Sequence, residues 1–560
     1  MCGIFFSLSR HGYLAPHEST TTRLRNRGPD HTRLHQVLVH DQLHATFLST
    51  LLSLRGTSLV SQPLLDQRTG SVLCWNGEAW SVHGDAVVGN DSDVVFHLLL
   101  KACASTSSSS DTMSAVLQLL AGIRGPYAIV FYDAVSRRIF YGRDCLGRRS
   151  LLTKSTKDGS LVLSSVCDNA TGDAWAEVEA DGLYVVDLHD TSQTQYNIMH
   201  IPHARMGEPP PSGLSLPLPF PPMNHHIPPS TAEADYKSLD EFRASLLQSL
   251  QVRTQHVREA IGPAVETPQH AAKVAVLFSG GLDCTILARL CHDLLPLDEC
   301  IDLLNVAFEN PRIHGKLEPG TSPYELCPDR ITARSSHAEL MHVCPGRRWR
   351  LVQVNVPYTE TVTHRGSVMA LMHPHNTEMD LSISYALYFA SRGNGAVSTS
   401  MGRATEPYTT PACVLLSGLG ADELFGGYQR HATAFSRHGY QGLIEELELD
   451  FDRLGKRNLG RDDRVISDSR KEVRFPFLDE DFIALALRLS VAEKCDFGQP
   501  EYRPSDDPSI VIEPAKRILR VLAYQLGMKR VAVEKKRAIQ FGARTAKMET
   551  GKTKGTHVLT

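Results

Sequence analysis

Apolar strands and helical segments alternate in the second half of the chain, and this alternation constrains the fold more than any other feature. The apolar runs "KVAVLF" (273–278), "CIDLLNVAF" (300–308), "WRLVQVNV" (349–356) and "ACVLLS" (412–417) are separated by longer helical segments. Strands joined in this way form a parallel sheet with helices on both faces. We therefore predict an α/β domain with a doubly wound parallel sheet over residues 236–550.

The first half, residues 2–190, has a different pattern. Short apolar or alternating runs such as "YAIVFYDAVSRRIFYGRD" (127–144) indicate strands. Two stretches with apolar residues three and four apart, "DSDVVFHLLLKAC" (91–103) and "DTMSAVLQLLAGI" (111–123), indicate helices. The first half is therefore predicted to be an α+β domain that is rich in sheet.

Residues 200–235 differ from both halves in composition. They include "EPPPSGLSLPLPFPPMNHHIPPS", whose prolines remove the backbone donors that helices and sheets need. We interpret this stretch as an extended linker between two domains; a proline-rich ligand for a partner domain is the alternative. Residues 551–560 are expected to form a C-terminal tail, and the Gly-, Ser- and Thr-rich stretch 392–412 a surface insertion.

The composition is that of an ordinary soluble protein. The 560 residues carry a net charge of −4, with 42% hydrophobic and 21% charged residues, which argues against a nucleic-acid or membrane-surface partner. The opening apolar run is too short for a secretory signal, so we expect a cytoplasmic location. Twelve cysteines without a CxxC pair indicate reduced thiols and argue against zinc. Whether the chain forms a homo-oligomer is left open.

The cysteine at position 2 is the first candidate catalytic residue. If Met1 is removed, the Cys2 thiol gains its own α-amine as a neighbour, and an amine with a pKa of about 7.7–8.0 can accept the thiol proton. Gly3 would let the backbone approach a substrate closely. The alternative is a buried cysteine in an edge strand.

Four motifs in the first half, in their order along the chain, resemble the class II glutamine amidotransferases, a family of N-terminal-nucleophile enzymes. The motifs are "RNRGPD" (25–30), "WNGE" (75–78), "NDSD" (90–93) and "GRDCLGRRSLL" (142–152). The resemblance implies an αββα sandwich in which Cys2 attacks the side-chain amide of glutamine. It also implies that the Asn76 side chain and the Gly77 N–H form the oxyanion hole.

The same resemblance assigns the rest of the glutamine site. It implies that Glu78 and Asp93 hold the α-amino end of glutamine. The family usually has an arginine for the glutamine carboxylate at the position of Leu51, and Arg55 is the nearby substitute. A strand-end surface arginine is the alternative interpretation of Arg55.

A second candidate site lies in "VAVLFSGGLDC" (274–284), where a strand runs into two glycines and then a helix. Such a junction directs backbone N–H groups and a helix N-terminus at one place, which favours an anion. The S-G-G-L-D run resembles the pyrophosphate loop of the ATP-pyrophosphatase superfamily. The resemblance implies that Asp283 binds Mg²⁺, that the adenine lies near Leu277 and Val306, and that the loop holds the β and γ phosphates. The loop residues are Ser279, Gly280, Gly281 and Leu282.

Three later stretches resemble the synthetase domain of asparagine synthetases. They are "LSGLGADELFGGYQRH" (416–431), "RDDRVISDSRKEVRFPFLDEDF" (461–482) and "KKRAIQFGARTAK" (535–547). The resemblance implies that Ser417 and Gly418 contact the nucleotide and that Asp422 is a second Mg²⁺ ligand.

Two residues depart from the family pattern. Cys284 replaces the serine that commonly ends the phosphate loop, and a thiol is a poorer donor than a hydroxyl. Leu419 replaces the glutamate that the family carries in S-G-E-G, where it is linked to handling the aspartyl adenylate and the incoming ammonia.

These resemblances imply a glutamine-dependent amidotransferase that uses glutamine, ATP with Mg²⁺, and aspartate, and that serves asparagine biosynthesis. Glutamine hydrolysis would supply ammonia, and adenylation of aspartate would prepare the acceptor. Two alternatives stay open. Because Leu419 cannot accept a proton, the enzyme could act on another carboxylate; and Leu419, Cys284 and Leu51 together are consistent with a scaffold that has lost synthetase turnover.

Overall fold

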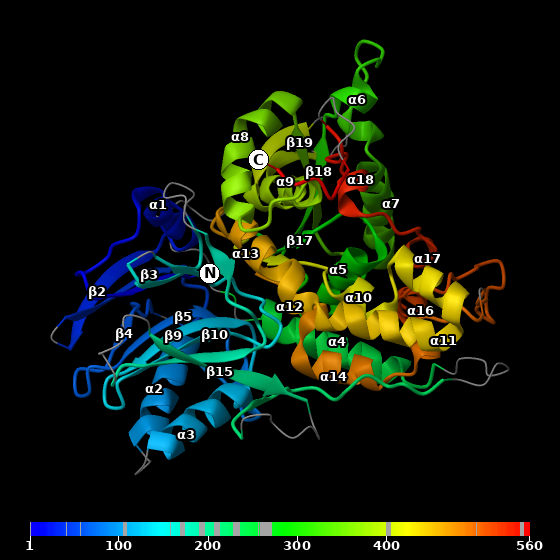
Figure 1. Cartoon of the computed structure of the whole chain (residues 1–560). Helices are drawn as coiled ribbons and strands as arrows, with labels where there is room; N and C mark the ends of the chain where they lie inside the picture. The colour runs from blue at the N-terminus through cyan, green and yellow to red at the C-terminus, as the bar shows by residue number, and fades with distance from the viewer. Residues whose placement is uncertain are drawn as a thin grey trace. The chain divides into compact units, whose positions relative to one another are not determined.

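The computed structural model describes most of the chain and divides it into two compact units (Figure 1). Unit 1 consists of Met1–Pro219, Met369–His375 and Leu454–Lys471, and unit 2 of Phe220–Val368, Asn376–Arg453 and Glu472–Thr560. The described residues are 2–40, 42–56, 58–104, 109–156, 158–167, 174–189, 196–205, 213–227, 236–255, 257, 271–398, 405–499, 501–548 and 554–559.

Two stacked sheets form the centre of unit 1. In the described residues the first has the order β13-β11-β12-β1-β3-β2, and the second has the order β16-β15-β14-β10-β9-β5-β4. Alternate residues of β1, including Ile4 and Phe6, pack with Val72 and Val130 of the second sheet, so the main core of the unit lies between the sheets. The first sheet comprises β13 (Ala176–Glu177), β11 (Leu152–Ser155), β12 (Leu161–Ser164), β1 (Gly3–Ser9), β3 (Leu43–Leu51) and β2 (His31–His40). The second comprises β16 (Leu216–Pro217), β15 (Asn197–Ala204), β14 (Gly182–Asp187), β10 (Arg138–Arg143), β9 (Tyr127–Asp133), β5 (Val72–Gly77) and β4 (Leu64–Leu65).

Helices cover the outer faces of both sheets. On the second sheet, α2 (Asp91–Ala104) and α3 (Ser109–Gly122) bury apolar residues against Trp75 and Phe131. On the first sheet, Leu24 of α1 (Glu18–Arg27) packs with Phe5. Figure 1 shows α2 and α3 against the sheet that contains β5 and β10, with α1 beside β3. The expected αββα sandwich is confirmed. A small sheet of β6 (Ser81–Val82), β7 (Asp85–Ala86) and β8 (Ile123–Arg124) adjoins it.

Unit 1 also contains segments from much later in the chain. The last turn of α8 (Tyr358–Met372) and the helices α12 (Leu454–Arg457) and α13 (Leu459–Ser467) belong to it. The stretch that we interpreted as a linker contributes the end of β15 and the short strand β16, which pair in parallel. Residues 206–212 and 228–235 of that stretch lie outside the described residues.

Unit 2 is built on a sheet with the order β21-β20-β19-β18-β17-β22-β23. The five neighbouring strands β19, β18, β17, β22 and β23 are parallel. The direction in which the sheet is built reverses between β17 and β22, as in a doubly wound sheet. All eight residues of β18 are buried, because helices cover both faces of the sheet. The doubly wound sheet is therefore confirmed. The parallel strands are β17 (Val274–Leu277), β18 (Ile301–Phe308), β19 (Trp349–Val356), β22 (Val414–Leu416) and β23 (Glu472–Arg474).

The stretch 392–412 is not simply a surface insertion. Its described parts form β20 (Asn394–Ser398) and β21 (Thr405–Thr409), an antiparallel pair that extends the sheet beside β19. Tyr408 of β21 donates a hydrogen bond to the buried Asp302 of β18, which fixes the pair to the sheet. Composition rich in Gly, Ser and Thr hid this strand pair in the sequence.

Helices of unit 2 surround this sheet. The helices are α4 (Leu239–Thr254), α5 (Leu282–Leu294), α6 (Pro311–His314), α7 (Pro328–Val343), α9 (Glu378–Arg392), α10 (Ala421–Phe425), α11 (Gln429–Asp452), α14 (Glu480–Arg488), α15 (Val491–Lys494), α16 (Arg517–Gln525), α17 (Lys529–Ala532) and α18 (Ile539–Gly542).

The strand order also indicates where a ligand would bind. A ligand in an open α/β sheet binds at the carboxyl ends of the strands where the strand order reverses, here after β17 and β22. Both strands run directly into the glycine-containing turns "SGG" and "SGLG".

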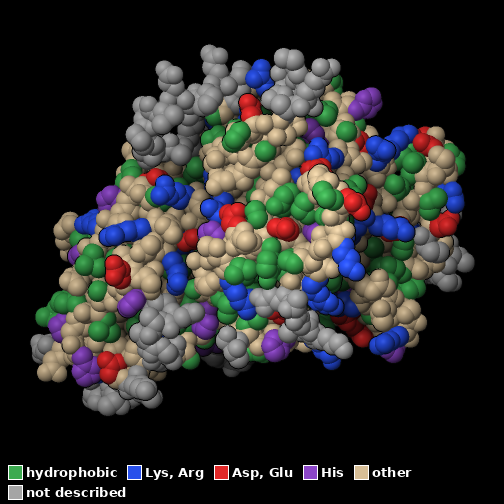
Figure 2. Space-filling model, turned by 90° about the horizontal axis from the view of Figure 1, so that it is seen from above, with side chains coloured by type: hydrophobic (Ala, Val, Ile, Leu, Met, Phe, Trp, Pro, Cys, Tyr) green, Lys and Arg blue, Asp and Glu red, His purple; other side chains and the backbone are tan. Residues whose placement is uncertain are grey.

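Acidic and basic side chains are interspersed on the face drawn in Figure 2, and no broad area of one sign covers the side chains described there. Within the described residues, no helix is both long and apolar enough to cross a membrane.

Candidate active sites

Cys2 lies directly before β1 and is held by hydrogen bonds on both sides. Its N–H donates to Asn76 Oδ1 at 3.1 Å, and its carbonyl accepts from Arg27 Nε at 3.3 Å. The next N–H, that of Gly3, donates to Thr50 Oγ1 at 3.1 Å. A Cβ atom at Gly3 would lie 2.5 Å from Thr50 Oγ1, so a larger residue would push the strand away. The cysteine is 93% buried by this arrangement, in a fixed backbone position.

The side-chain amide nitrogen of Asn76, Nδ2, is a buried hydrogen-bond donor that has no partner among the described residues. The Asn76 side chain is fully buried at the end of β5, and no hydrogen bond reaches Nδ2. Buried polar groups are almost always bonded, so an unpaired donor beside Cys2 suits an oxygen of a bound substrate. Gly77 follows, and a Cβ there would lie 2.6 Å from Pro126 O. The structure thus brings Cys2 and the predicted oxyanion-hole residues together.

Gln62 is a residue of this site that the sequence did not reveal. Its Nε2 lies 4.0 Å from Cys2 Sγ, and its Oε1 accepts the Trp75 N–H at 2.9 Å. The second bond fixes which end of the amide faces the sulfur, so the amide donor points at the thiol. A single glutamine in a loop belongs to no pattern that would mark it in the sequence.

Arg55 and Glu78 lie side by side, but Arg55 is largely occupied. Its Nη1 is 3.4 Å from Glu78 Oε2 and donates to Ala79 O at 2.9 Å, while Nη2 donates to Val87 O at 2.8 Å. These carbonyl contacts give the guanidinium a structural task near the site. Leu51, where the family has its arginine, is buried at the end of β3.

Of the two aspartates in "NDSD", the buried one is not the one that we assigned. Asp93 lies in the first turn of α2 with 52% of its side chain exposed, 3.5 Å from His97 Nδ1. Asp91 is buried and accepts from Trp75 Nε1 at 2.9 Å and from the Ala79 N–H at 3.0 Å. Burial raises the pKa of Asp91, and Arg55 opposes that rise. Asp91 therefore binds Trp75 and Ala79, the residues on either side of the segment that carries Asn76 and Glu78.

The predicted phosphate loop joins β17 to α5. Gly280 has φ = +79°, and a Cβ there would lie 2.4 Å from the Ala333 N atom of α7, so only glycine fits. Gly281 precedes the first turn of α5, and its N–H donates to Ser279 Oγ at 3.3 Å. The thiol of Cys284 donates to Gly281 O at 3.3 Å, and burial raises its pKa, so it stays a neutral part of the loop.

Asp283 and Asp422, the two predicted metal ligands, lie on either side of one lysine. Lys516 Nζ is 2.6 Å from Asp283 Oδ2 and 2.7 Å from Asp422 Oδ1, and Lys536 Nζ is 2.6 Å from Asp422 Oδ1. Burial alone would raise the pKa of Asp422, but the two lysines outweigh it and lower that pKa to about 2. Both carboxylates thus contact the same positively charged group, Lys516 Nζ.

The two carboxylates also fit a hard cation. Asp283 Oδ1 is buried and accepts no hydrogen bond from the described residues, so one oxygen of the pair is available to a ligand. Mg²⁺ prefers such oxygens and is usually held by one or two carboxylates together with substrate phosphates. Within the described residues no group of three or more His, Cys, Asp or Glu side chains that could hold a metal ion is found.

Asp283→Ala and Asp422→Ala are each expected to weaken Mg–ATP binding by roughly tenfold or more, since a charged contact is worth about 1.5–3 kcal/mol. Calorimetry with magnesium present measures this. Asp293→Ala is the matched control, because Asp293 lies on α5 but pairs with Arg289 and Arg243 instead. Unchanged nucleotide affinity in both cleft variants would remove the metal assignment.

Two adjoining clefts open around these residues. The first cleft has a volume of about 580 Å³, including its opening to solvent, and most of its lining residues are charged. The second has a volume of about 760 Å³, also including its opening, and most of its lining is apolar. Ser279, Gly281, Asp283, Asp329 and Arg537 line both. The apolar cleft is also lined by the predicted nucleotide contacts Leu277, Val306, Ser417 and Gly418, and the charged one by Leu282.

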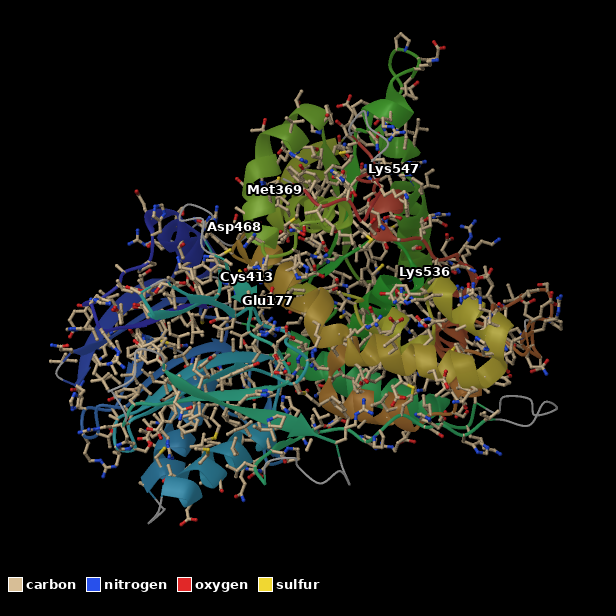
Figure 3. All side chains as sticks on the ribbon, viewed as in Figure 1. Glu177, Met369, Cys413, Asp468, Lys536 and Lys547 are labelled. Atoms are coloured by element: carbon tan, nitrogen blue, oxygen red, sulfur yellow. The ribbon has the colours of Figure 1, made fainter. Side chains whose placement is uncertain are left out.

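Several charged residues of these clefts were missed in the sequence. Lys536, labelled in Figure 3, also lies 3.9 Å from the centre of the Tyr428 ring. Asp329, in the first turn of α7, is buried, and burial raises its pKa to about 7 although Arg537 and Arg544 oppose the rise. The basic stretch 535–547 was a signal for Lys536, whereas nothing in the sequence marked Asp329 or Lys516.

Leu419 follows the cleft-lining Gly418, and its N–H donates to Ser417 Oγ at 3.3 Å. Among the described residues the linings of the two clefts include Ser417 and Gly418 but not Leu419. The position where the family carries a glutamate thus adjoins the cleft and offers no acid or base.

Comparison with known proteins matches both halves of the chain. The family described as "Glutamine amidotransferase domain" matches residues 1–207, and the family described as "Asparagine synthase" matches residues 404–445 and 437–555. Asparagine synthetase domain-containing protein 1 of Bos taurus is 34% identical over 99% of this chain and 97% of its own length. The Homo sapiens protein of the same name is 32% identical over 98% and 96%. A putative glutamine-hydrolysing asparagine synthetase of Methanocaldococcus jannaschii is 36% identical over 24% of this chain and 28% of its own length.

Proposed function

This chain belongs to the asparagine synthetase domain-containing protein 1 family, and from that premise we propose that it is a glutamine-dependent, ATP-dependent amidotransferase that makes asparagine from aspartate. Its substrates would be the small molecules glutamine, ATP and aspartate, and its place would be cytoplasmic asparagine biosynthesis. The observation that carries the proposal is the buried Cys2 beside the unpaired donor Asn76 Nδ2.

In the first half-reaction, Cys2 Sγ bonds to the carbonyl carbon of the glutamine side-chain amide, and the C–N bond of that amide breaks. Once Met1 is removed, the thiol proton passes to the Cys2 α-amine, which would replace the N–H that now faces Asn76 Oδ1. Asn76 Nδ2 and the Gly77 N–H stabilise the oxyanion. The amine returns the proton to the leaving ammonia, and water then cleaves the thioester to give glutamate and the free thiol. Glu78 and Arg55 bind the ends of glutamine in this proposal, with Asp93 as the second amino-end contact.

In the second half-reaction, an oxygen of the acceptor carboxylate bonds to the α-phosphorus of ATP and pyrophosphate leaves; ammonia then bonds to the carboxyl carbon and AMP leaves. The apolar cleft around Leu277 and Val306 suits the adenine, and the loop from Ser279 to Leu282 suits the phosphates. Asp283 and Asp422 would hold Mg²⁺, which neutralises phosphate charge when it is bound. Lys516 and Lys536 then supply positive charge on the protein side of the same cleft.

Leu419 favours a second candidate function. Without a carboxylate at this position the acid–base task assigned to it in the family is unfilled, so the acceptor could be a carboxylate other than aspartate. A third reading, a scaffold without synthetase turnover, rests on the same residue together with Cys284 and Leu51.

Product analysis with the purified chain distinguishes these functions. The assay supplies glutamine, aspartate, ATP and Mg²⁺ and measures glutamate, AMP and asparagine. We expect all three products. Glutamate alone would indicate a glutaminase, and no product would support the scaffold. AMP that forms only when another carboxylate replaces aspartate in the assay would indicate a different acceptor.

A further inference from the structure

A buried ion network holds the carbonyl of Cys2. Arg27 Nε donates to this carbonyl at 3.3 Å, and the Arg27 side chain is fully buried. The other two nitrogens of the same guanidinium donate to α13: Nη2 to Asp463 Oδ2 at 2.8 Å and Nη1 to Ser467 Oγ at 2.5 Å. The Arg27 guanidinium thus links the backbone of Cys2 to side chains much later in the chain. Asp463 follows Arg27 by 436 residues.

Asp463 is itself fixed from several sides. Its Oδ2 also accepts the Ser150 N–H at 3.1 Å, and its Oδ1 lies 3.6 Å from Arg149 Nη1. The side chains of Asp463 and Arg149 are both fully buried. A carboxylate placed between two guanidinium groups and a backbone N–H has little freedom, so it is a firm support for Arg27.

The helix that carries Asp463 is anchored within unit 1. Arg464 Nη1 lies 2.6 Å from Glu177 Oε1, and its Nε donates to Leu371 O at 2.9 Å. At the end of the helix, Asn26 Nδ2 donates to Asp468 Oδ1 at 2.9 Å. Figure 3 labels Glu177 and Asp468 close to α13. The second half of α13 and its C-cap are therefore bonded within unit 1, and Asn26 is the immediate neighbour of Arg27.

We propose that Asp463 is a positioning residue for the nucleophile, an inference that rests on the proposed glutaminase function. The N–H of Cys2 is held by Asn76 and the N–H of Gly3 by Thr50, so the Cys2 carbonyl is the remaining backbone group that needs a fixed partner. Asp463 holds Arg27, Arg27 holds this carbonyl, and together they fix the direction of Cys2 Sγ.

Asp463→Asn tests the proposal, because it keeps the size of the side chain and removes its charge. A misplacement of about 1 Å far from the chemistry can cost roughly 10²-fold, so we expect the kcat of glutamine hydrolysis to fall roughly 10- to 100-fold with KM changed much less. The rate at which iodoacetamide alkylates Cys2, followed against pH, should also shift. A merely structural role would lower the folded fraction and leave kcat per folded molecule unchanged.

Asp462→Asn is the matched control. Asp462 is the neighbouring buried carboxylate on α13, and it pairs with Arg461 at 2.8 Å rather than with Arg27. Equal losses of kcat in both variants, or an unchanged kcat in folded Asp463→Asn, would overturn the proposal. If Asp463→Asn does not fold, Arg27→Lys decides instead: it keeps the positive charge but cannot bind the Cys2 carbonyl and Asp463 with a guanidinium, and an unchanged kcat there counts against the proposal.

Failure of the proposed function gives a different result. If the wild-type chain hydrolyses no glutamine, the proposed glutaminase is wrong, but the alkylation of Cys2 still compares its position in the two proteins. An alkylation profile that shifts in Asp463→Asn and not in Asp462→Asn supports the positioning role, and identical profiles in all three proteins contradict it.

Discussion

Replacement of Cys2 by alanine is expected to abolish glutamine hydrolysis and to leave ATP binding and any ammonia-dependent reaction intact. Loss of the nucleophile costs a hydrolase on the order of 10⁶-fold in kcat. In the proposed mechanism the thiol serves only the first half-reaction, and the clefts proposed for the nucleotide are built from unit 2. Glutamate release measures the first effect, and ammonia-driven AMP formation measures the second.

A glutaminase rate in Cys2→Ala close to that of the wild type would rule out the nucleophile. Cys74→Ala is the matched control, because Cys74 is a fully buried thiol of β5 that packs in the core between the sheets. The mature N-terminus is a second check. A mass spectrum in which most molecules keep Met1 would contradict the mechanism, since an acylated nitrogen cannot act as the base.

Leu419→Glu is expected to increase asparagine production from ATP and glutamine by roughly 10²–10⁴-fold, the contribution of a positioned acid–base group. The residue follows Gly418 in the turn that borders the apolar cleft, so the new carboxylate would adjoin the cleft proposed for the nucleotide. Asparagine and AMP, measured against the wild type under the same conditions, report the gain. A smaller gain would implicate Cys284 or Leu51 as further causes of a slow wild-type reaction.

Two controls make the Leu419→Glu result interpretable. A charge in a partly buried turn is costly, so thermal unfolding and ATP affinity must first match the wild type. Leu419→Gln supplies the same shape without the ionisable group and should bring little gain. If folded, ATP-binding Leu419→Glu makes no asparagine but amidates another carboxylate, then aspartate is not the acceptor.

The sequence predicted the layers of both units because their signals are local. Apolar β18, for example, is buried along its whole length, as a central parallel strand requires, and α2 and α3 follow the spacing of their apolar residues. The motif resemblance also brought Cys2 and Asn76 to one place, although 74 residues separate them. Local pattern and motif order therefore carried the architecture and the centre of the first site.

Other parts of the sites depend on contacts that no local pattern contains. The run Arg461–Arg464 is four charged residues in a row, yet all four side chains are buried because each finds a partner in unit 1. Asp91 and Asp93 differ in exposure only through the phase of α2 against Trp75 and Ala79. Lys516 reaches Asp283 across 233 residues. Such pairings are set by tertiary folding.

Helix α13 comes late in the sequence but belongs to unit 1, and this affects the folding of the newly made chain and the choice of fragments that can be expressed alone. During synthesis, Arg27 leaves the ribosome long before its partners Asp463 and Ser467, so the nascent sandwich must wait for residues up to Lys471 before its buried charges are neutralised. A recombinant fragment that stops at Pro219 would keep every motif of the first half but would lack Asp463 and Ser467, the side chains that bind the Arg27 guanidinium. The amidotransferase half is thus continuous in its motifs and discontinuous in its folding.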